Sequence, residues 1–163
     1  MCIRDRILPP EIADNFRNAT LSMYAQSDDE SLSAVGVNRE FYVYGYDENA
    51  VIDEQSPVIE AMYLNHESFR NGDAVNPSPM LIARVSDDTG LNMSLSGIGH
   101  QMTVRIDNDL SFNDVSSSFI PASDGSPSGD IAYQLPELTA GNHTATLRVW
   151  DIGGNSATAS VDF

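Results

Sequence analysis

The sequence predicts an all-β protein whose main part is an immunoglobulin-like antiparallel β-sandwich of about seven strands, preceded by the last strands of another β-domain. Helical periodicity is nearly absent, and short alternating or apolar runs recur along the chain. Clusters of Gly, Pro, Asn, Asp and Ser separate these runs, as turns do. The 163 residues are 41% hydrophobic, which is enough for one buried core.

The first two strands are expected before residue 57. In residues 19–25, hydroxyl-bearing side chains alternate with apolar ones, as in a half-buried strand. Residues 41–46 are aromatic and β-branched and predict a second strand. Two or three strands cannot bury a core by themselves. Residues 7–56 are therefore interpreted as the tail of an upstream β-domain followed by a linker.

From residue 57 onward the runs and turns are evenly spaced and predict the sandwich over residues 57–163. Its strands are expected at residues 58–64, 80–85, 102–107, weakly within 112–120, and then at 131–135, 144–150 and 157–163. Alternation also predicts which side chains point inward on three of these strands. The inward sets are Leu81, Ala83 and Val85; Met102, Val104 and Ile106; and Ala145, Leu147 and Val149.

Residues 1–6 are unlike the rest of the chain and resemble a translated adapter remnant, so they are interpreted as a non-native leader. This leader contains Cys2, the single cysteine of the chain. Without it the sequence offers no thiol nucleophile, disulfide or thiolate metal ligand. The Cys…Trp…Cys pattern of antibody domains is also missing, so the prediction concerns architecture alone.

The charge balance excludes two kinds of partner. Asp and Glu number 24 against 8 basic residues, for a formal net charge of −16, and every basic residue is an arginine. Such a surface repels nucleic acid and anionic membranes. No apolar run approaches the roughly 18–20 residues of a membrane-spanning helix, so direct membrane insertion is not expected. A lysine-free acidic surface stays soluble in salty water, which suggests a marine or hypersaline source.

Two loops are expected at the same end of the sandwich, because the strands that precede them run in the same direction. They cover residues 86–92 and 150–156. Their oxygen-bearing side chains belong to Asp87, Asp88, Asn92, Asp151 and Asn155. Carboxylate and amide oxygens suit Ca²⁺, so a calcium site is one interpretation. The alternative is plain loop closure by Asx turns, with no cofactor.

Four further residues are expected to shape this loop end structurally, namely Gly90, Gly99, His100 and Trp150. His100 is open to two interpretations, a general base or ligand on one hand and a hydrogen bond between the loops on the other. The three histidines of the chain lack metal-ligand spacing, and no nucleophile-elbow motif occurs. We expect no catalytic residue in this chain.

Several motifs, taken in order, resemble one family. They are Asp53-Glu54-Gln55-Ser56-Pro57, Asn76-Pro77-Ser78-Pro79, Asp87-Asp88-Thr89-Gly90-Leu91-Asn92, Gly97-Ile98-Gly99-His100, and Trp150-Asp151 with Asn155-Ser156. Over residues 7–163 the chain resembles the C-terminal region of the type IX secretion sortases called PorU, which are gingipain-like cysteine peptidases of Bacteroidetes-type bacteria. Similar loops also occur in general bacterial Ig-like repeats.

The resemblance implies an exported parent protein that acts at the outer membrane or cell surface. That parent would cleave C-terminal sorting signals from cargo and attach the new carboxyl end to a lipopolysaccharide anchor. The family's His–Cys catalytic pair lies upstream and matches no residue here, so this chain is expected to be a non-catalytic accessory module. Its implied partners are the adjacent peptidase domain and other type IX secretion components. The alternative is a generic adhesive or structural Ig-like repeat of a secreted surface protein.

Overall fold

The computed structural model of the chain describes residues 18–27, 31–42, 52–94 and 99–163. The leader, Cys2 and residues 43–46 lie outside these ranges. The chain forms two compact units, one over Ile12–Val51 and another whose described part lies within Ile52–Phe163. Among the described residues, no helix has the length and apolar character needed to cross a membrane.

The first unit contains an antiparallel hairpin of β1 (Asn18–Gln26) and β2 (Ser33–Tyr42). The prediction of the first strand is confirmed, with one more residue at each end. The predicted start of the second strand was wrong, because β2 begins at Ser33 rather than at residue 41. Gly36 and Asn38 weaken the strand pattern in the sequence, yet both have partners in the ladder, Met23 and Leu21.

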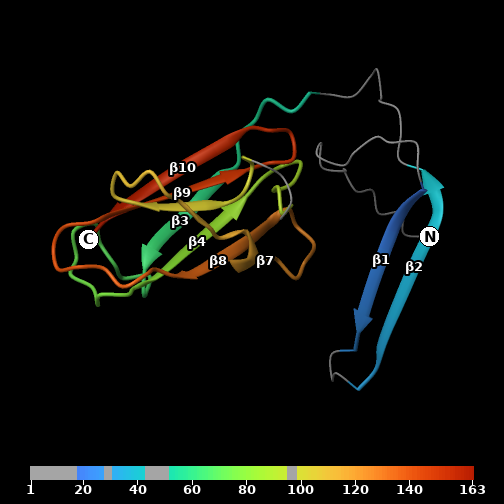
Figure 1. Cartoon of the computed structure of the whole chain (residues 1–163), viewed down its shortest axis with the longest axis horizontal. Helices are drawn as coiled ribbons and strands as arrows, with labels where there is room; N and C mark the ends of the chain where they lie inside the picture. The colour runs from blue at the N-terminus through green and yellow to red at the C-terminus, as the bar shows by residue number, and fades with distance from the viewer. Residues whose placement is uncertain (1–17, 28–30, 43–51, 95–98) are drawn as a thin grey trace. The chain divides into compact units, whose positions relative to one another are not determined.

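The second unit is a sandwich of two four-stranded antiparallel sheets (Figure 1). One sheet has the order β3 (Val58–Leu64), β4 (Met80–Ser86), β8 (Ser128–Gln134) and β7 (Phe119–Pro121). The other has the order β10 (Ser156–Asp162), β9 (Thr144–Trp150), β5 (Thr103–Ile106) and β6 (Asn113–Asp114). These orders match the ABED and CFG sheets of immunoglobulin-like domains. The predicted fold class is confirmed.

The weak strand expected within residues 112–120 is in fact two short strands in different sheets. β6 pairs with β5, and β7 pairs with β8. Between them the 3-10 helix η1 (Ser116–Ser118) carries the chain from one sheet to the other, and Val115 at this crossing is fully buried. The prediction of one strand was wrong because consecutive serines form the crossing turn. The described part of the sandwich therefore has eight strands.

Side chains from both sheets form one hydrophobic core. The inward residues predicted on β4 and β9 are all fully buried, and so are Met102 and Val104. Ile106 is partly buried and packs against the core. Each large side chain removed from water contributes roughly 1.5–3 kcal/mol to stability.

The strands β7 and β8 approach each other closely at Gly129. A Cβ atom at Gly129 would lie 2.4 Å from the carbonyl oxygen of Ile120 and 2.5 Å from Cζ of Phe119. The ring of Phe119 therefore occupies the space that any larger residue at position 129 needs. β8 begins at Ser128, three residues before the predicted start, because the pairing with β7 and β4 extends through this glycine.

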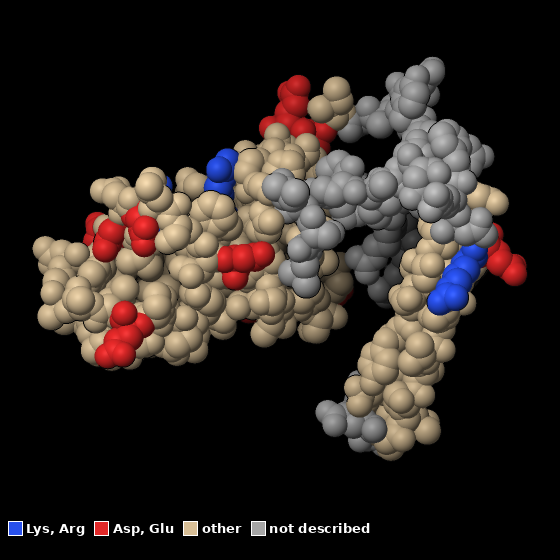
Figure 2. Space-filling view, viewed as in Figure 1, with Lys and Arg blue, Asp and Glu red and all other residues tan. Residues whose placement is uncertain are grey.

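Most of the sandwich face in Figure 2 is uncharged, and acidic groups are more numerous than basic ones on it. Arg84 Nε and Asp130 Oδ1 form an ion pair of 2.9 Å between neighbouring strands β4 and β8. Their side chains are 60% and 53% exposed. Solvent screening limits such an exposed pair to roughly 0–1 kcal/mol.

Candidate functional site

The loops that follow β4 and β9 lie side by side at one end of the sandwich, as their strand directions predict. The backbone N–H of Asn92 donates to the carbonyl oxygen of Trp150 at 2.8 Å. The N–H of Ile152 donates to the carbonyl oxygen of Gly90 at 3.0 Å. Leu91 and Asp151 also form an isolated antiparallel bridge. The five oxygen-bearing residues predicted from the sequence therefore share one end of the fold, but they divide into separate groups.

Asp151 and Asn155 form the first group and close the β9–β10 loop. Asp151 is only 1% exposed. Its Oδ1 accepts the backbone N–H of Asn155 at 2.7 Å, and its Oδ2 accepts the side-chain amide of Asn155 at 2.8 Å. The same amide donates to the backbone carbonyl of Asp53 at 3.0 Å. Both oxygens of Asp151 thus have internal donors, which fits the loop-closing interpretation of these two residues.

Asn92 is the second group and stands apart. It is 2% exposed, and its Oδ1 accepts the backbone N–H of Ser94 at 2.9 Å, which forms an Asx turn. The amide oxygen of Asn92 thus serves the local backbone.

Asp87 and Asp88 belong to the third group. Asp87 Oδ2 accepts the backbone N–H groups of Thr89 at 2.9 Å and Gly90 at 2.7 Å, so this carboxylate shapes its own loop. Gly90 has φ = 133°, a conformation that glycine adopts without strain. Asp87 Oδ1, however, is buried and has no hydrogen-bond partner. A buried carboxylate oxygen without a donor is unfavourable.

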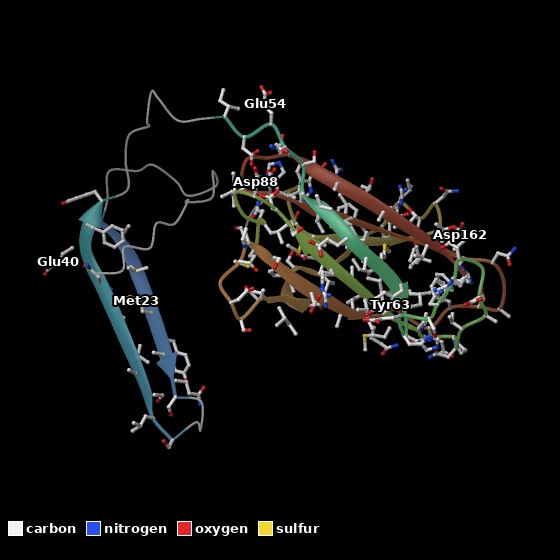
Figure 3. All side chains as sticks on the ribbon, turned by 180° about the vertical axis from the view of Figure 1, so that it is seen from behind. Met23, Glu40, Glu54, Tyr63, Asp88 and Asp162 are labelled. Atoms are coloured by element: carbon white, nitrogen blue, oxygen red, sulfur yellow. The ribbon has the colours of Figure 1, made fainter. Side chains whose placement is uncertain are left out.

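Asp53 joins Asp87 and Asp88, although the sequence placed it in a linker. One carboxylate oxygen from each of the three residues lies within 4.8 Å of the others. Asp88 is exposed, whereas Asp53 and Asp87 are partly buried. Figure 3 labels Asp88 and Glu54 at this end of the sandwich, opposite Tyr63 and Asp162. We call Asp53, Asp87 and Asp88 the acidic cluster.

Thr89 links two members of the acidic cluster. Its hydroxyl lies 2.5 Å from Asp53 Oδ2 and 3.0 Å from Asp87 Oδ2. One hydroxyl carries one proton and donates to one carboxylate at a time. Donation by Thr89 and by the N–H of Gln55 lowers the pKa of Asp53. The cluster therefore gathers carboxylate oxygens, one of which, Asp87 Oδ1, is buried without a donor, and carboxylate oxygens are ligands suited to a hard cation such as Ca²⁺.

His100 and Trp150 stand beside each other at the same end. Their ring centroids are 4.5 Å apart, and Arg148 Cζ lies 4.1 Å from the centre of the Trp150 ring. Gly99, just before His100, has φ = 89° and turns the chain into this contact. His100 thus packs against the tryptophan ring at this end.

The opposite end of the sandwich contains a contact that the sequence reading missed. His143 Nδ1 lies 2.9 Å from Asp107 Oδ2, and its Nε2 lies 2.8 Å from the carbonyl oxygen of Thr139. Asp107 lies in the turn after β5, and its Oδ1 accepts the backbone N–H of Thr144 at 2.9 Å. The hydrogen bond from His143 lowers the pKa of Asp107, and Asp107 in turn raises the pKa of His143.

The fold and the loop-end geometry define an immunoglobulin-like β-sandwich module whose loops are closed by Asp and Asn side chains. The chain is similar to PorU from Porphyromonas gingivalis, as seen in the crystal structure of dimeric latent PorU. The two share 31% sequence identity with a TM-score of 0.67. The match covers 97% of this chain and 15% of the PorU chain, so the chain spans a small part of that protein's length.

The resemblance to PorU that the motifs suggested is therefore confirmed over nearly the whole chain. The similarity is consistent with the C-terminal region of PorU. No family model matches the sequence, and no curated protein matches it.

Proposed function

We propose that the chain is a non-catalytic accessory module of a PorU-like sortase of the type IX secretion system. The observation that carries this proposal is the similarity to PorU over 97% of the chain at 31% identity. The parent protein is then a gingipain-like cysteine peptidase that removes C-terminal sorting signals from exported cargo and anchors the product. Its location is the outer membrane or cell surface, and its catalytic residues lie in another part of the polypeptide.

The sequence supports the non-catalytic role. Its only cysteine, Cys2, lies in the segment interpreted as a non-native leader. Each of the three described histidines has a contact within the fold: His66 with the Ser68 hydroxyl, His100 with the Trp150 ring and His143 with Asp107. The module's role is then to support the adjacent peptidase domain or to contact other type IX secretion components.

One experiment compares the purified chain with the complete parent protein. The chain alone is expected to leave a cargo peptide with a C-terminal sorting signal intact. In the parent, Leu147→Asp disrupts the core of the sandwich, because it buries an unpaired charge at a fully buried position. We expect this change to impair cargo processing, whereas Thr158→Asp on the exposed face of β10 leaves processing unchanged.

Two results would contradict the proposal. Cleavage by the chain alone would show that it is itself a peptidase. Normal processing by a parent whose sandwich is unfolded would show that the module does not support the peptidase. A parent reading frame made of tandem copies of the same sandwich would favour the adhesive-repeat interpretation instead.

We also propose that the acidic cluster binds Ca²⁺. Two observations favour it: one carboxylate oxygen from each of the three residues lies within 4.8 Å of the others, and Asp87 has a second, buried oxygen, Oδ1, without a hydrogen-bond partner. A cation at this position would compensate the buried oxygen and the mutual repulsion of the three carboxylates. It would also join the segment before β3 to the β4–β5 loop.

The test is thermal unfolding of the chain in excess CaCl₂ and in EDTA, with MgCl₂ as a second cation. We expect Ca²⁺ to raise the Tm by several degrees. Asp88→Asn removes one exposed ligand without touching the internal hydrogen bonds of Asp87, and it should abolish most of this shift. Asp114→Asn, on β6 outside the cluster, is the matched control. Equal melting temperatures in Ca²⁺ and EDTA would rule out a stabilising site.

A further inference from the structure

The β1–β2 hairpin carries large apolar side chains on both of its faces. Tyr24 is directly opposite Val35 in the register, and Val37 follows two residues later, so these three share a face. Leu21 and Met23 alternate with them and occupy the other face. All five are well exposed, from 46% for Leu21 to 75% for Val35. A strand pair that stood free in water would be expected to show polar side chains on at least one face.

Met23 also lies across the backbone of β2. The two residues Met23 and Gly36 are partners in the ladder, and a Cβ at Gly36 would come within 3.4 Å of Met23 Cε. Because Gly36 has no side chain, nothing projects from the backbone at this position, and the apolar Met23 side chain covers it. A glycine inside a strand often marks a place where another chain approaches closely.

The edges of the hairpin are only weakly protected. Within the described residues β1 and β2 form a sheet of two strands, which leaves the outer edge of each strand without a ladder partner. Natural edge strands are protected by charge, proline or bulges. The one register irregularity of this hairpin lies near the start of β1, between Ala19 and Leu21. Here Arg39 and Glu40, near the end of β2, are the only charged residues of the two strands. The strands therefore carry no net charge in a chain whose formal charge is −16.

We propose that β1 and β2 are inner strands of a β-domain formed with the preceding part of the same polypeptide. Strands of that part pair with both edges of the hairpin, and its side chains cover both faces. An isolated two-stranded hairpin is marginally stable at best, so these apolar residues need such a surrounding. This inference takes one point from the proposed function, namely that the module is part of a longer polypeptide.

The similarity to PorU favours the preceding part of the same polypeptide, rather than a second copy of the chain, as the partner of the hairpin. The match covers 97% of this chain, hairpin included for the most part, but only 15% of the PorU polypeptide. In that protein the corresponding segment thus belongs to a far longer chain. Two copies of the present chain would each bring a charge of −16, and their repulsion opposes association at low salt.

Amide hydrogen exchange tests the proposal directly. In the 163-residue chain we expect the amides of β1 and β2 to exchange at least about a hundredfold faster than those of β4 and β9. In the parent polypeptide, which includes the residues encoded upstream, the hairpin amides should become protected to a similar extent as β4. Equal, fast exchange of the hairpin in both proteins would overturn the proposal.

A matched pair of variants of the parent separates docking from general unfolding. Val35→Asp places a charge on the apolar hairpin face and should remove the protection of β1 and β2 while β4 stays protected. Val58→Asp makes the same change at a valine of β3 that is 55% exposed and should leave the hairpin protected. If Val35→Asp also leaves it protected, the faces are not covered as proposed.

Light scattering of the 163-residue chain tests whether a second copy of the chain covers the hairpin instead. A monomer with an unprotected hairpin is expected. A dimer in which the hairpin is protected would overturn the proposal in favour of pairing between two copies. Because these readouts are exchange rates and mass, they stay informative even if the parent has no sortase activity.

Discussion

His143 holds the turn at Asp107 with a ring nitrogen 2.9 Å from the carboxylate, while its other ring nitrogen faces the carbonyl oxygen of Thr139 at 2.8 Å. Both partners are acceptors, so the imidazole makes both hydrogen bonds only when both of its nitrogens carry a proton. The ring is then a cation that joins the β5–β6 turn to the β8–β9 loop. This end of the sandwich should respond to pH in the range where histidine titrates.

The first prediction concerns this pH dependence. The pKa of His143 is raised above 6.5 in the folded state, so its contribution is fully present below pH 6.5 and is lost as the pH rises through the folded pKa. The pKa of Asp107 is lowered below 3.8, so its contribution is present above pH 3.8 and is lost as the pH falls through its folded pKa. The contact should therefore stabilise the fold most between about pH 4 and pH 6.5.

Urea unfolding across this pH range provides the measurement. The wild-type chain should lose stability from pH 6 to pH 9, and His143→Gln should lose less over the same interval. Asp107→Asn should flatten the profile similarly, because asparagine tolerates the positive φ of 53° at this position. Parallel profiles for the wild type and both variants would show that the contact contributes nothing.

The second prediction concerns the close approach of β7 to β8. Gly129→Ala places a methyl group 2.4 Å from a backbone oxygen and 2.5 Å from the Phe119 ring. The strands must move apart, at a cost of roughly 1–3 kcal/mol in the free energy of unfolding. In a Phe119→Ala background the same change should cost less, because the ring is gone although the Ile120 oxygen remains. Urea unfolding of the four proteins measures this coupling, and strict additivity would contradict the packing described.

The third prediction concerns the buried carboxylate of Asp151. Asp151→Ala removes the acceptor of the backbone N–H of Asn155 and one of the two acceptors of its side-chain amide, which still donates to the Asp53 carbonyl. We expect a loss of roughly 2–3 kcal/mol in unfolding free energy, since unsatisfied buried donors are costly. The matched control is Glu137→Ala on the exposed β8–β9 loop, which should change stability by less than about 0.5 kcal/mol. A similar effect for both variants would contradict the loop-closing role.

The fourth prediction concerns salt. The chain carries a formal charge of −16, and its self-repulsion destabilises the compact state at low ionic strength. Raising NaCl from about 10 mM to about 1 M shortens the screening length from roughly 30 Å to 3 Å. The urea midpoint should rise over this range, most steeply at the low end. A midpoint independent of salt would argue against the inferred adaptation to salty water.

The core could be predicted because its sequence pattern is local. Leu147 and Val149 alternate with polar neighbours within one strand, and alternation alone assigns them to the inside. β2 was harder to predict, because Gly36 and Asn38 have low strand propensity. They are part of the strand because they pair with β1. The division into β6 and β7 depends on packing of Val115 between the sheets, which no local pattern shows.

Part of the candidate site was predictable because it follows from local sequence patterns. Asp87 and Asp88 follow a recognisable strand, and strand direction places their loop beside that of Asp151. Asp53 lies 34 positions before Asp87 in a segment without periodicity, and only the chain's path brings it to Thr89. The Asp107–His143 contact likewise joins residues 36 positions apart. Contacts of this length depend on tertiary structure and leave no motif in the sequence.

Trp150 is the single tryptophan of the chain, and its ring contacts both His100 and Arg148 at the loop end. Its indole emission therefore reports on this end of the sandwich alone, without signal from the hairpin or from the His143 end. A change in the β4–β5 or β9–β10 loop alters the ring's surroundings and hence the emission wavelength. The protein thus contains a built-in optical probe, one residue away from the buried carboxylate of Asp151.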